Sequence, residues 1–122
     1  MPIPNLFILY VSDPLSSAPF YETLFGRAPT AAFPTYVAFS FGNGMTVALW
    51  SASARDFVSS GTGHRSELCF MVAAADEVAA LQERWERAGV VIEQPLHEAV
   101  FGPTFVALDP DGHRIRVCMP DK

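Results

Sequence analysis

The sequence predicts an α+β protein built from two tandem β-α-β-β-β modules. A hairpin pattern occurs twice, because residues 34–39 (PTYVAF) match residues 103–108 (PTFVAL) almost position for position. Each run leads into a turn and then into a second apolar strand. The apolar run at residues 5–11 is likewise matched by residues 66–72, and a helical pattern follows each of these two runs. Repetition of this kind indicates a duplicated supersecondary unit.

The first half begins with a strand and a helix. Residues 5–11 (NLFILYV) form an apolar run that predicts a strand buried on both faces. Residues 12–14 (SDP) stop the strand and offer a helix start, and Gly26 offers a helix end. Pro19 leaves two alternatives open, since the helix proper either begins near Ser17 or is kinked. The side chains expected to face inward from this helix are Leu15, Phe20, Leu24 and Phe25.

The hairpin of the first half is expected to have strands at residues 35–41 and 45–50. Its turn (SFGNG) is expected to be one residue longer than the DPDG turn of the tail. The stretch that follows, as far as Arg65, is small, polar and glycine-rich, a composition typical of flexible connections. We therefore predict a first module at residues 1–52, a linker at 53–65 and a second module at 66–122.

The second half carries the clearest helical pattern, at residues 76–88. Charged residues lie largely off its apolar stripe, and Gly89 ends it. We interpret Trp85 as part of the core rather than as a ligand contact, because it lies on that stripe. A further strand begins at residues 90–92, and the tail hairpin completes the second module. The stripe consists of Val78, Leu81, Trp85 and Ala88.

Composition argues against several classes of protein. Half of the residues are hydrophobic, so the chain has enough apolar material for a sizeable core. A net charge of −5 argues against a surface for nucleic acid or anionic membranes. No apolar run approaches the ~18 residues of a membrane span and no secretory leader is recognisable, which predicts a cytoplasmic protein. Cys69 and Cys118 are too few for a disulfide framework and are expected to be reduced.

The paired modules, the Phe20-Tyr21 pair and the Asp-Pro-Asp-Gly turn before the last strand resemble the vicinal oxygen chelate superfamily. That superfamily includes glyoxalase I, extradiol dioxygenases and bleomycin-binding proteins. The resemblance covers essentially the whole chain and implies curved mixed sheets that form a cleft. Because this scaffold hosts enzymes and binding proteins alike, the fold leaves the function open.

Further motifs resemble the phenazine antibiotic resistance branch of this superfamily. That resemblance implies a metal-free homodimer that binds a planar phenazine antibiotic and sequesters it. The motifs are Pro4-Asn5-Leu6, Tyr10-Val11-Ser12, Tyr36-Val37-Ala38-Phe39, Trp50-Ser51, Val100-Phe101-Gly102, Thr104-Phe105, Asp109-Pro110-Asp111-Gly112-His113 and Ile115-Arg116-Val117-Cys118.

The family pattern also places four metal-ligand positions on the first and last strands of the modules. A single carboxylate cannot hold a divalent ion, and a guanidinium among the ligands would repel it. His64, His97 and His113 are expected in the linker, a loop and a turn, where they do not rescue the site. We therefore predict no metal and no other cofactor. The four positions hold Leu6, Ala48, Glu67 and Arg116.

Strand alternation predicts which side chains line the expected cleft. Trp50 offers an indole face for stacking on a flat aromatic ring, and the weaker candidates are Tyr10, Tyr36 and Phe39. Glu67 and Arg116 form either a structural ion pair or a pair that orients the ligand, and both readings stay open. The predicted ligand-binding residues are Ile8, Tyr10, Trp50, Glu67, Met71, Arg116 and Cys118.

The sequence thus favours a homodimeric protein that sequesters a planar aromatic antibiotic. One alternative is a structural dimer without a ligand, which a cleft filled by the chain's own side chains would favour. The other is an enzyme related to glyoxalases or dioxygenases that acts on a small aromatic or oxo substrate. Glu67 would be its base, but a neighbouring Arg116 would lower the pKa of this carboxylate and weaken it as a base. Neither cysteine is a convincing nucleophile, because no histidine is placed beside it.

Overall fold

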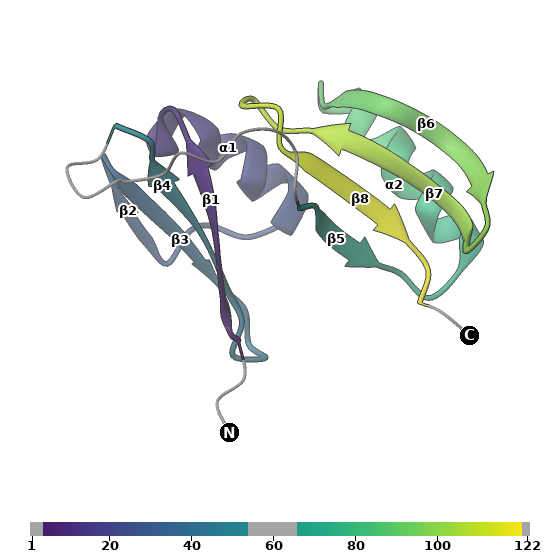
Figure 1. Cartoon of the computed structure of the whole chain (residues 1–122), viewed down its shortest axis with the longest axis horizontal. Helices are drawn as coiled ribbons and strands as arrows, with labels where there is room; N and C mark the ends of the chain where they lie inside the picture. The colour runs from purple at the N-terminus through teal and green to yellow at the C-terminus, as the bar shows by residue number, and fades with distance from the viewer. Residues whose placement is uncertain (1–3, 54–65, 121–122) are drawn as a thin grey trace. The chain divides into compact units, whose positions relative to one another are not determined.

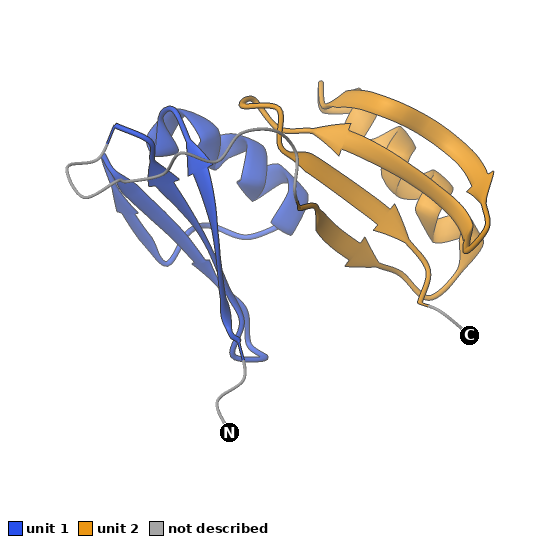
Figure 2. Cartoon of the chain, in the orientation of Figure 1, with its two compact units in different colours: residues 1–61 blue, residues 62–122 orange. Residues whose placement is uncertain are grey.

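The computed structural model describes residues 4–53 and 66–120. The chain divides into two compact units, residues 1–61 and 62–122 (Figure 2). Within the described residues, each unit consists of one helix and one four-stranded sheet. The expected linker at 53–65 lies outside the described residues except for Ser53.

Unit 1 has the strand order β1-β4-β3-β2, with β1 parallel to β4 and the other neighbours antiparallel (Figure 1). Helix α1 packs on one face of this sheet, against β2, β3 and β4. The elements are β1 (Leu6–Val11), α1 (Pro14–Phe25), β2 (Ala31–Phe33), β3 (Tyr36–Ser40) and β4 (Thr46–Ser51).

Unit 2 repeats this topology with the order β5-β8-β7-β6. Strand β5 is parallel to β8, and helix α2 packs behind β6, β7 and β8 (Figure 1). The predicted α+β fold with duplicated β-α-β-β-β modules is confirmed. The elements are β5 (Leu68–Met71), α2 (Ala75–Arg87), β6 (Val91–Ala99), β7 (Gly102–Leu108) and β8 (Arg114–Cys118).

The two units also repeat the register in which the first strand pairs with the last strand, β1 with β4 and β5 with β8. Ile8 lies opposite Ala48 in unit 1, and Cys69 lies opposite Arg116 in unit 2. Because Ile8 and Cys69 are equivalent in the repeated first strand, Ala48 and Arg116 are equivalent in the last one. This is the equivalence that the sequence predicted.

The two hairpin turns have the same length, so the expected extra residue in the first turn is wrong. The Phe41 N–H donates to the Met45 carbonyl at 2.8 Å, and the Asp109 N–H donates to the His113 carbonyl at 2.9 Å. Ser40 is the last residue of β3 rather than part of the turn. Each turn therefore begins one residue after its strand, at Phe41 and at Asp109.

The sequence match between the PTYVAF and PTFVAL runs differs by one position from the match that the strand pairing gives. Val37 lies opposite Leu49, and Phe105 lies opposite Val117. Leu49 and Val117 are equivalent in the two units. Val37 therefore corresponds to Phe105, and not to Val106 as the sequence match suggested. The residues Pro34-Thr35 form the β2–β3 turn, whereas Pro103-Thr104 lie inside β7.

Helix α1 begins at Pro14, so the expected start near Ser17 is wrong. The Asp13 carboxylate caps it by accepting hydrogen bonds from the Ser16 N–H at 3.3 Å and the Ser16 hydroxyl at 2.8 Å. The helix continues through the exposed Pro19 and ends at Gly26, which has φ 65°.

The inward face of α1 differs from the expected one. Leu15 is exposed and Phe20 only half-buried, whereas Leu24 is buried as expected. Ser17, Tyr21 and Leu24 follow the i, i+4, i+7 spacing of one helix face, and this spacing orients the helix with Tyr21 fully inside. The buried residues are Pro14, Ser17, Ala18, Tyr21 and Leu24.

Helix α2 matches its predicted stripe more closely. Trp85 is 1% exposed and packs edge-on against Phe70 and Phe105, which confirms its place in the core. Ala88 was expected to face inward but is exposed, because it is the cap residue where the helix ends before Gly89 (φ 88°).

Strand β1 alternates between its two faces. Leu9 and Val11 are buried, while Ile8 and Tyr10 are exposed. The expected burial on both faces is therefore wrong, and the predicted alternation is confirmed. The apolar run is continuous because its outward side chains are apolar too.

Strand β6 extends through a stretch that was expected to be a loop, and it carries His97. Pro95 is tolerated because β6 is an edge strand with two register shifts. The Gln82 side chain of α2 accepts a hydrogen bond from the Leu96 N–H at 2.7 Å, so the helix covers part of this edge.

Candidate ligand-binding site

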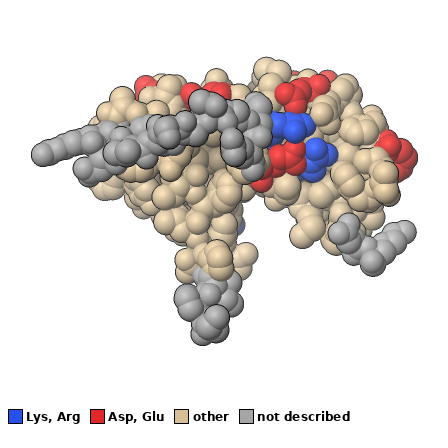
Figure 3. Space-filling model, in the orientation of Figure 1, with Lys and Arg blue, Asp and Glu red and all other residues tan. Residues whose placement is uncertain are grey.

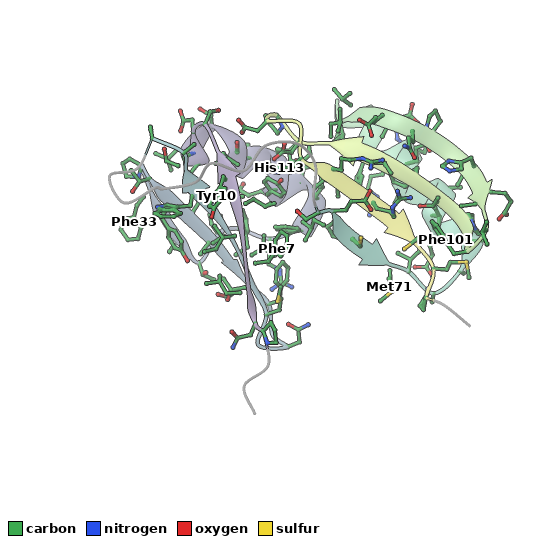
Figure 4. The ribbon with its side chains drawn as sticks, in the orientation of Figure 1. Phe7, Tyr10, Phe33, Met71, Phe101 and His113 are labelled. Carbon is green, nitrogen blue, oxygen red and sulfur yellow. The ribbon has the colours of Figure 1, made fainter. Side chains whose placement is uncertain are left out.

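Four aromatic side chains form a row across the sheet of unit 1, on the face opposite α1. Tyr10 lies opposite Trp50, Trp50 opposite Tyr36, and Tyr36 opposite Phe33, so each strand contributes one ring. The Tyr10 and Trp50 ring centroids lie 6.1 Å apart at an angle of 54°. We call these four residues the aromatic row; Figure 4 labels Tyr10 and Phe33.

A second row, next to the aromatic row on the same sheet face, consists of small and aliphatic side chains. Ile8 lies opposite Ala48, and Ala48 lies opposite Ala38. Of the predicted ligand-binding residues, Ile8, Tyr10 and Trp50 thus share one face of unit 1. Tyr36 joins them there.

Phe39 lies on the other face of this sheet and contacts Phe25 of α1 edge-on at 5.1 Å. Phe41 also contacts Phe25, which confirms that Phe39 and Phe41 share a face. As a ligand candidate Phe39 is wrong, because it is fully buried against the helix. Sequence reasoning missed Phe33, which is 59% exposed.

A cluster of two acidic and two basic side chains occupies the equivalent face of unit 2. The Arg116 Nε and Nη2 donate to the two Glu67 carboxylate oxygens at 2.7 and 3.1 Å. Arg114 Nη1 lies 3.0 Å from Glu67 Oε2, and its Nε donates to Glu93 Oε1 at 3.0 Å. We call these residues the Glu67 cluster. Figure 3 shows Arg/Lys and Asp/Glu atoms side by side on this face of unit 2.

Thr104 and Phe101 hold Arg116 from two further sides. The fully buried Thr104 hydroxyl accepts a hydrogen bond from Arg116 Nη1 at 3.1 Å and donates to the Val117 carbonyl at 2.7 Å. The Arg116 Cζ lies 5.7 Å from the centroid of the Phe101 ring. Thr104 belongs to a motif of the resemblance, but its hydrogen bond to Arg116 was not predicted, because a threonine is usual inside an apolar strand.

The electrostatics of the cluster work against acid–base chemistry. The hydrogen bond from Arg116 lowers the pKa of the Glu67 carboxyl, although partial burial opposes this shift. Burial, followed by the charge of Glu67, raises the pKa of the Cys69 thiol. Glu67 is therefore a weak base at neutral pH, and Cys69 stays protonated and is a weak nucleophile.

Met71 and Cys118 lie on the same face of unit 2 as Arg116. Met71 is opposite Cys118 in the β5–β8 pair, and Cys69 is opposite Arg116. Met71 is 67% exposed and is labelled in Figure 4. The structure thus brings Glu67, Met71, Arg116 and Cys118 together on one sheet face. That these residues and the aromatic row line one cleft stays a prediction.

The chemistry of the family's metal positions does not fit a metal in this chain. Leu6 and Ala48 offer no ligand atom, and both Glu67 oxygens accept from arginine. Over residues 4–53 and 66–120, no group of three or more His, Cys, Asp or Glu side chains is placed to hold an ion. His97 lies on β6 and His113 in the tail turn, while His64 lies outside the described residues.

Unit 2 also contains a hollow of about 550 Å³ that sequence reasoning missed. It lies where the β6–β7 turn meets the start of α2 and the segment after β8, and Phe101 connects it to Arg116. Its lining residues are Ala75, Glu98, Ala99, Val100, Phe101, Gly102, Pro103, Met119 and Pro120.

Residues 3–117 match the sequence profile of the Glyoxalase/Bleomycin resistance protein/Dioxygenase superfamily. The chain belongs to this superfamily. Within it, the chain is 35% identical to the phenazine antibiotic resistance protein EhpR of Enterobacter agglomerans, and the match covers 97% of this chain and 92% of that one.

Two solved structures are also similar to this chain. A protein of Agrobacterium tumefaciens, solved by NMR in solution, is 36% identical, with a TM-score of 0.86 over the whole of both chains. A glyoxalase-related enzyme from Fulvimarina pelagi is 26% identical, with a TM-score of 0.81 over 98% of this chain and 89% of that one. Neither helix in the described part of the chain is long and apolar enough to cross a membrane.

Proposed function

We propose that this chain binds a planar aromatic small molecule of the phenazine type and sequesters it chemically unchanged, which would confer resistance to such an antibiotic. The observation that carries the proposal is the aromatic row, in which Tyr10, Trp50 and Tyr36 stand side by side on the sheet face opposite α1. Aromatic side chains on a sheet face offer flat surfaces against which a flat ring system stacks.

The similarity to EhpR supports the same proposal. Its identity of 35% extends over nearly the full length of both chains. The residues of the predicted site that lie on unit 1 include Tyr10 and Trp50, which also belong to the motifs that resemble the phenazine resistance branch.

The enzymatic alternative has less support from the site. Arg116 lowers the pKa of Glu67 and occupies both carboxylate oxygens, so the carboxylate is poorly suited to take a proton from a substrate. The four family ligand positions, with Leu6 and Ala48 among them, lack the donors for a Lewis-acidic metal. Our proposal therefore includes no metal and no catalytic step.

The proposal further includes a cytoplasmic homodimer. The exposed apolar side chains of β1 and β2, which include Ile8 and Phe33, offer surface that a partner or a ligand would cover. Light scattering of the purified protein, with and without ligand, measures the oligomeric state directly. A monomer under both conditions would remove the dimer from the proposal.

Equilibrium dialysis against phenazine-1-carboxylate, followed by mass spectrometry of the recovered compound, tests the proposed function. We expect saturable binding and full recovery of unchanged compound after long incubation. Conversion of the compound would point to an enzyme, and the absence of saturable binding by this phenazine and by its carboxamide would overturn the proposal.

A further inference from the structure

We infer that the sulfur atoms of Cys69, Met71 and Cys118 form a binding site for one Cu(I) ion. This inference goes beyond the proposed function, because the binding of an aromatic molecule requires no ion. The site also lies apart from the four positions at which the family pattern places metal ligands, since none of those four residues contributes a donor to it.

Strands β5 and β8 place the three sulfur side chains on one face of unit 2. Cys69 and Met71 are two residues apart on β5, and alternate side chains of a strand share a face. Met71 lies opposite Cys118 in the parallel β5–β8 pair, so Cys118 lies on that face too. The Val72 N–H donates to the Cys118 carbonyl at 2.8 Å, which ties the ends of the two strands together. The three sulfur atoms are therefore carried by a fixed backbone.

Solvent reaches all three side chains, and the two thiols lie within electrostatic reach of each other. Met71 is 67% exposed, Cys69 is exposed and Cys118 is half-buried. After burial and the charge of Glu67, the charge of Cys118 is the next cause that raises the pKa of the Cys69 thiol. The Cys69 thiol meets the Glu67 carbonyl at 4.0 Å, a weak contact that rotation about χ1 releases. The thiol can then turn toward Met71 and Cys118.

The diagonal placement of Cys69 and Cys118 favours a bridging ion over a disulfide. In ideal parallel strands about 4.8 Å apart, with a rise of about 3.3 Å per residue, diagonal neighbours lie roughly 8 Å apart at Cα. A disulfide requires a Cα separation below about 7 Å. Two metal–sulfur bonds of about 2.3 Å span ~4.6 Å between the sulfur atoms, whereas a disulfide bond spans only ~2 Å. The longer bridge matches the wider separation.

Two thiols and a thioether are a donor set for a soft ion. Soft sulfur ligands select Cu(I), whereas Zn²⁺ takes thiolate, imidazole or carboxylate ligands and is almost always four-coordinate in structural sites. Binding of Cu(I) forms two bonds to thiolate sulfur, releases both thiol protons to solvent and gives a unit with one negative charge. Met71 supplies the third, neutral ligand, and Arg116 is the cation opposite Cys69.

Competition with the coloured Cu(I) chelator bicinchoninate tests this inference on the full chain. Ascorbate serves as the reductant and air is excluded, so that neither the copper nor the thiols oxidise. We expect each chain to withdraw one Cu(I) ion from the chelator. Cys69→Ser and Cys118→Ser should each lower the affinity for Cu(I) by at least about 100-fold, because loss of a partner outside the ligand shell already costs up to that factor. Met71→Leu should lower it by about tenfold.

Met45→Leu is the matched control for Met71→Leu, because it removes a thioether from unit 1 and should leave the affinity for Cu(I) unchanged. Cys69 and Cys118 are the only cysteines in the sequence, so no other thiol competes for the ion. Because Cys69 is exposed, Cys69→Ser supplies the answer if Cys118→Ser does not fold.

Three results would overturn the inference. The first is a parent chain that withdraws no Cu(I) from the chelator. The second is a cysteine variant that binds Cu(I) as tightly as the parent chain does. The third is a stoichiometry of one ion for two chains, because the ion would then be bridged between chains.

Discussion

The Arg116 guanidinium and the Glu67 carboxylate meet in a bidentate hydrogen bond, with Nε···Oε1 at 2.7 Å and Nη2···Oε2 at 3.1 Å. These two residues stand at positions where metal-using relatives are expected to place ligands. An ion pair in which each charge neutralises the other satisfies the partly buried carboxylate without an ion. The pair also fixes a guanidinium on the sheet face where Met71 and Cys118 lie.

Glu67 should make the stability of the chain depend on pH in the acid range. Its pKa in the folded chain lies below the ordinary value of 4.5, so the unfolded chain binds more protons there and stability rises with pH. This contribution is complete above about pH 4.5 and is lost as the pH falls through the folded pKa.

We therefore expect Glu67→Gln to lower the melting temperature at neutral pH, and the difference from the parent to narrow as the pH falls below 4.5. Thermal unfolding followed by circular dichroism at several pH values measures this. Glu83→Gln, an exposed site on α2, controls for the change in net charge. A difference that stays constant down to pH 3 would contradict the assigned role of the pair.

Added divalent metal ions should not stabilise the chain. Leu6 and Ala48 supply no ligand atoms, and Glu67 is engaged by arginine, so Zn²⁺, Ni²⁺ and Mn²⁺ should leave the melting temperature unchanged. The prediction fails if a metal produces a saturable rise in melting temperature that Glu67→Gln abolishes.

Pro19→Ala should stabilise unit 1. Pro19 is exposed in the interior of α1, where proline lacks the N–H that would bond to the carbonyl one turn earlier. Alanine restores this donor at a cost in unfolded-chain entropy, and we expect a net gain of about 1–2 kcal/mol. Urea denaturation compares the two chains, and a lower midpoint for Pro19→Ala would show that the proline ring makes a favourable contact.

The equivalence of the first and last strands of the two modules was predictable, because the first strand is repeated in sequence and Gly44 and Gly112 align the strands that follow them. Ile8 and Tyr10 were placed correctly on the face opposite α1, as were Glu67 and Arg116 on theirs. The equivalence of the third strands, β3 and β7, was not predictable. Val37 and Val106 look equivalent in sequence, but in the sheets Val37 and Phe105 occupy the equivalent positions. Similar residues one position apart carry no information about register.

Phe33 was not predicted as a ligand-binding residue, for a different reason. Strand β2 has only three residues, and their alternation is too short to reveal a face. The row of rings is visible only after β2 is paired with β3. The strand at residues 90–92 was expected to give way to a loop at His97, whereas β6 continues past Pro95 because an edge strand tolerates proline.

Trp50 should contribute more to ligand affinity than any residue of the core. Trp50→Ala removes a stacking surface and apolar contact area, which should weaken the binding of phenazine-1-carboxylate by about 1–3 kcal/mol, or roughly 5- to 150-fold. Trp85→Phe removes the other indole of the chain from the core and is the matched control, with affinity close to that of the parent. Equilibrium dialysis measures the three dissociation constants, and an unchanged affinity for Trp50→Ala would remove this residue from the site.

Fluorescence titration of the Trp85→Phe chain tests the central claim most directly, because Trp50 is then the only tryptophan in the sequence. If a flat ligand stacks in the aromatic row, phenazine-1-carboxylate should quench the Trp50 emission saturably, with the dissociation constant found by dialysis. Emission that decreases only in proportion to added compound, while dialysis shows saturable binding, would contradict the account, because the ligand would then lie away from Trp50.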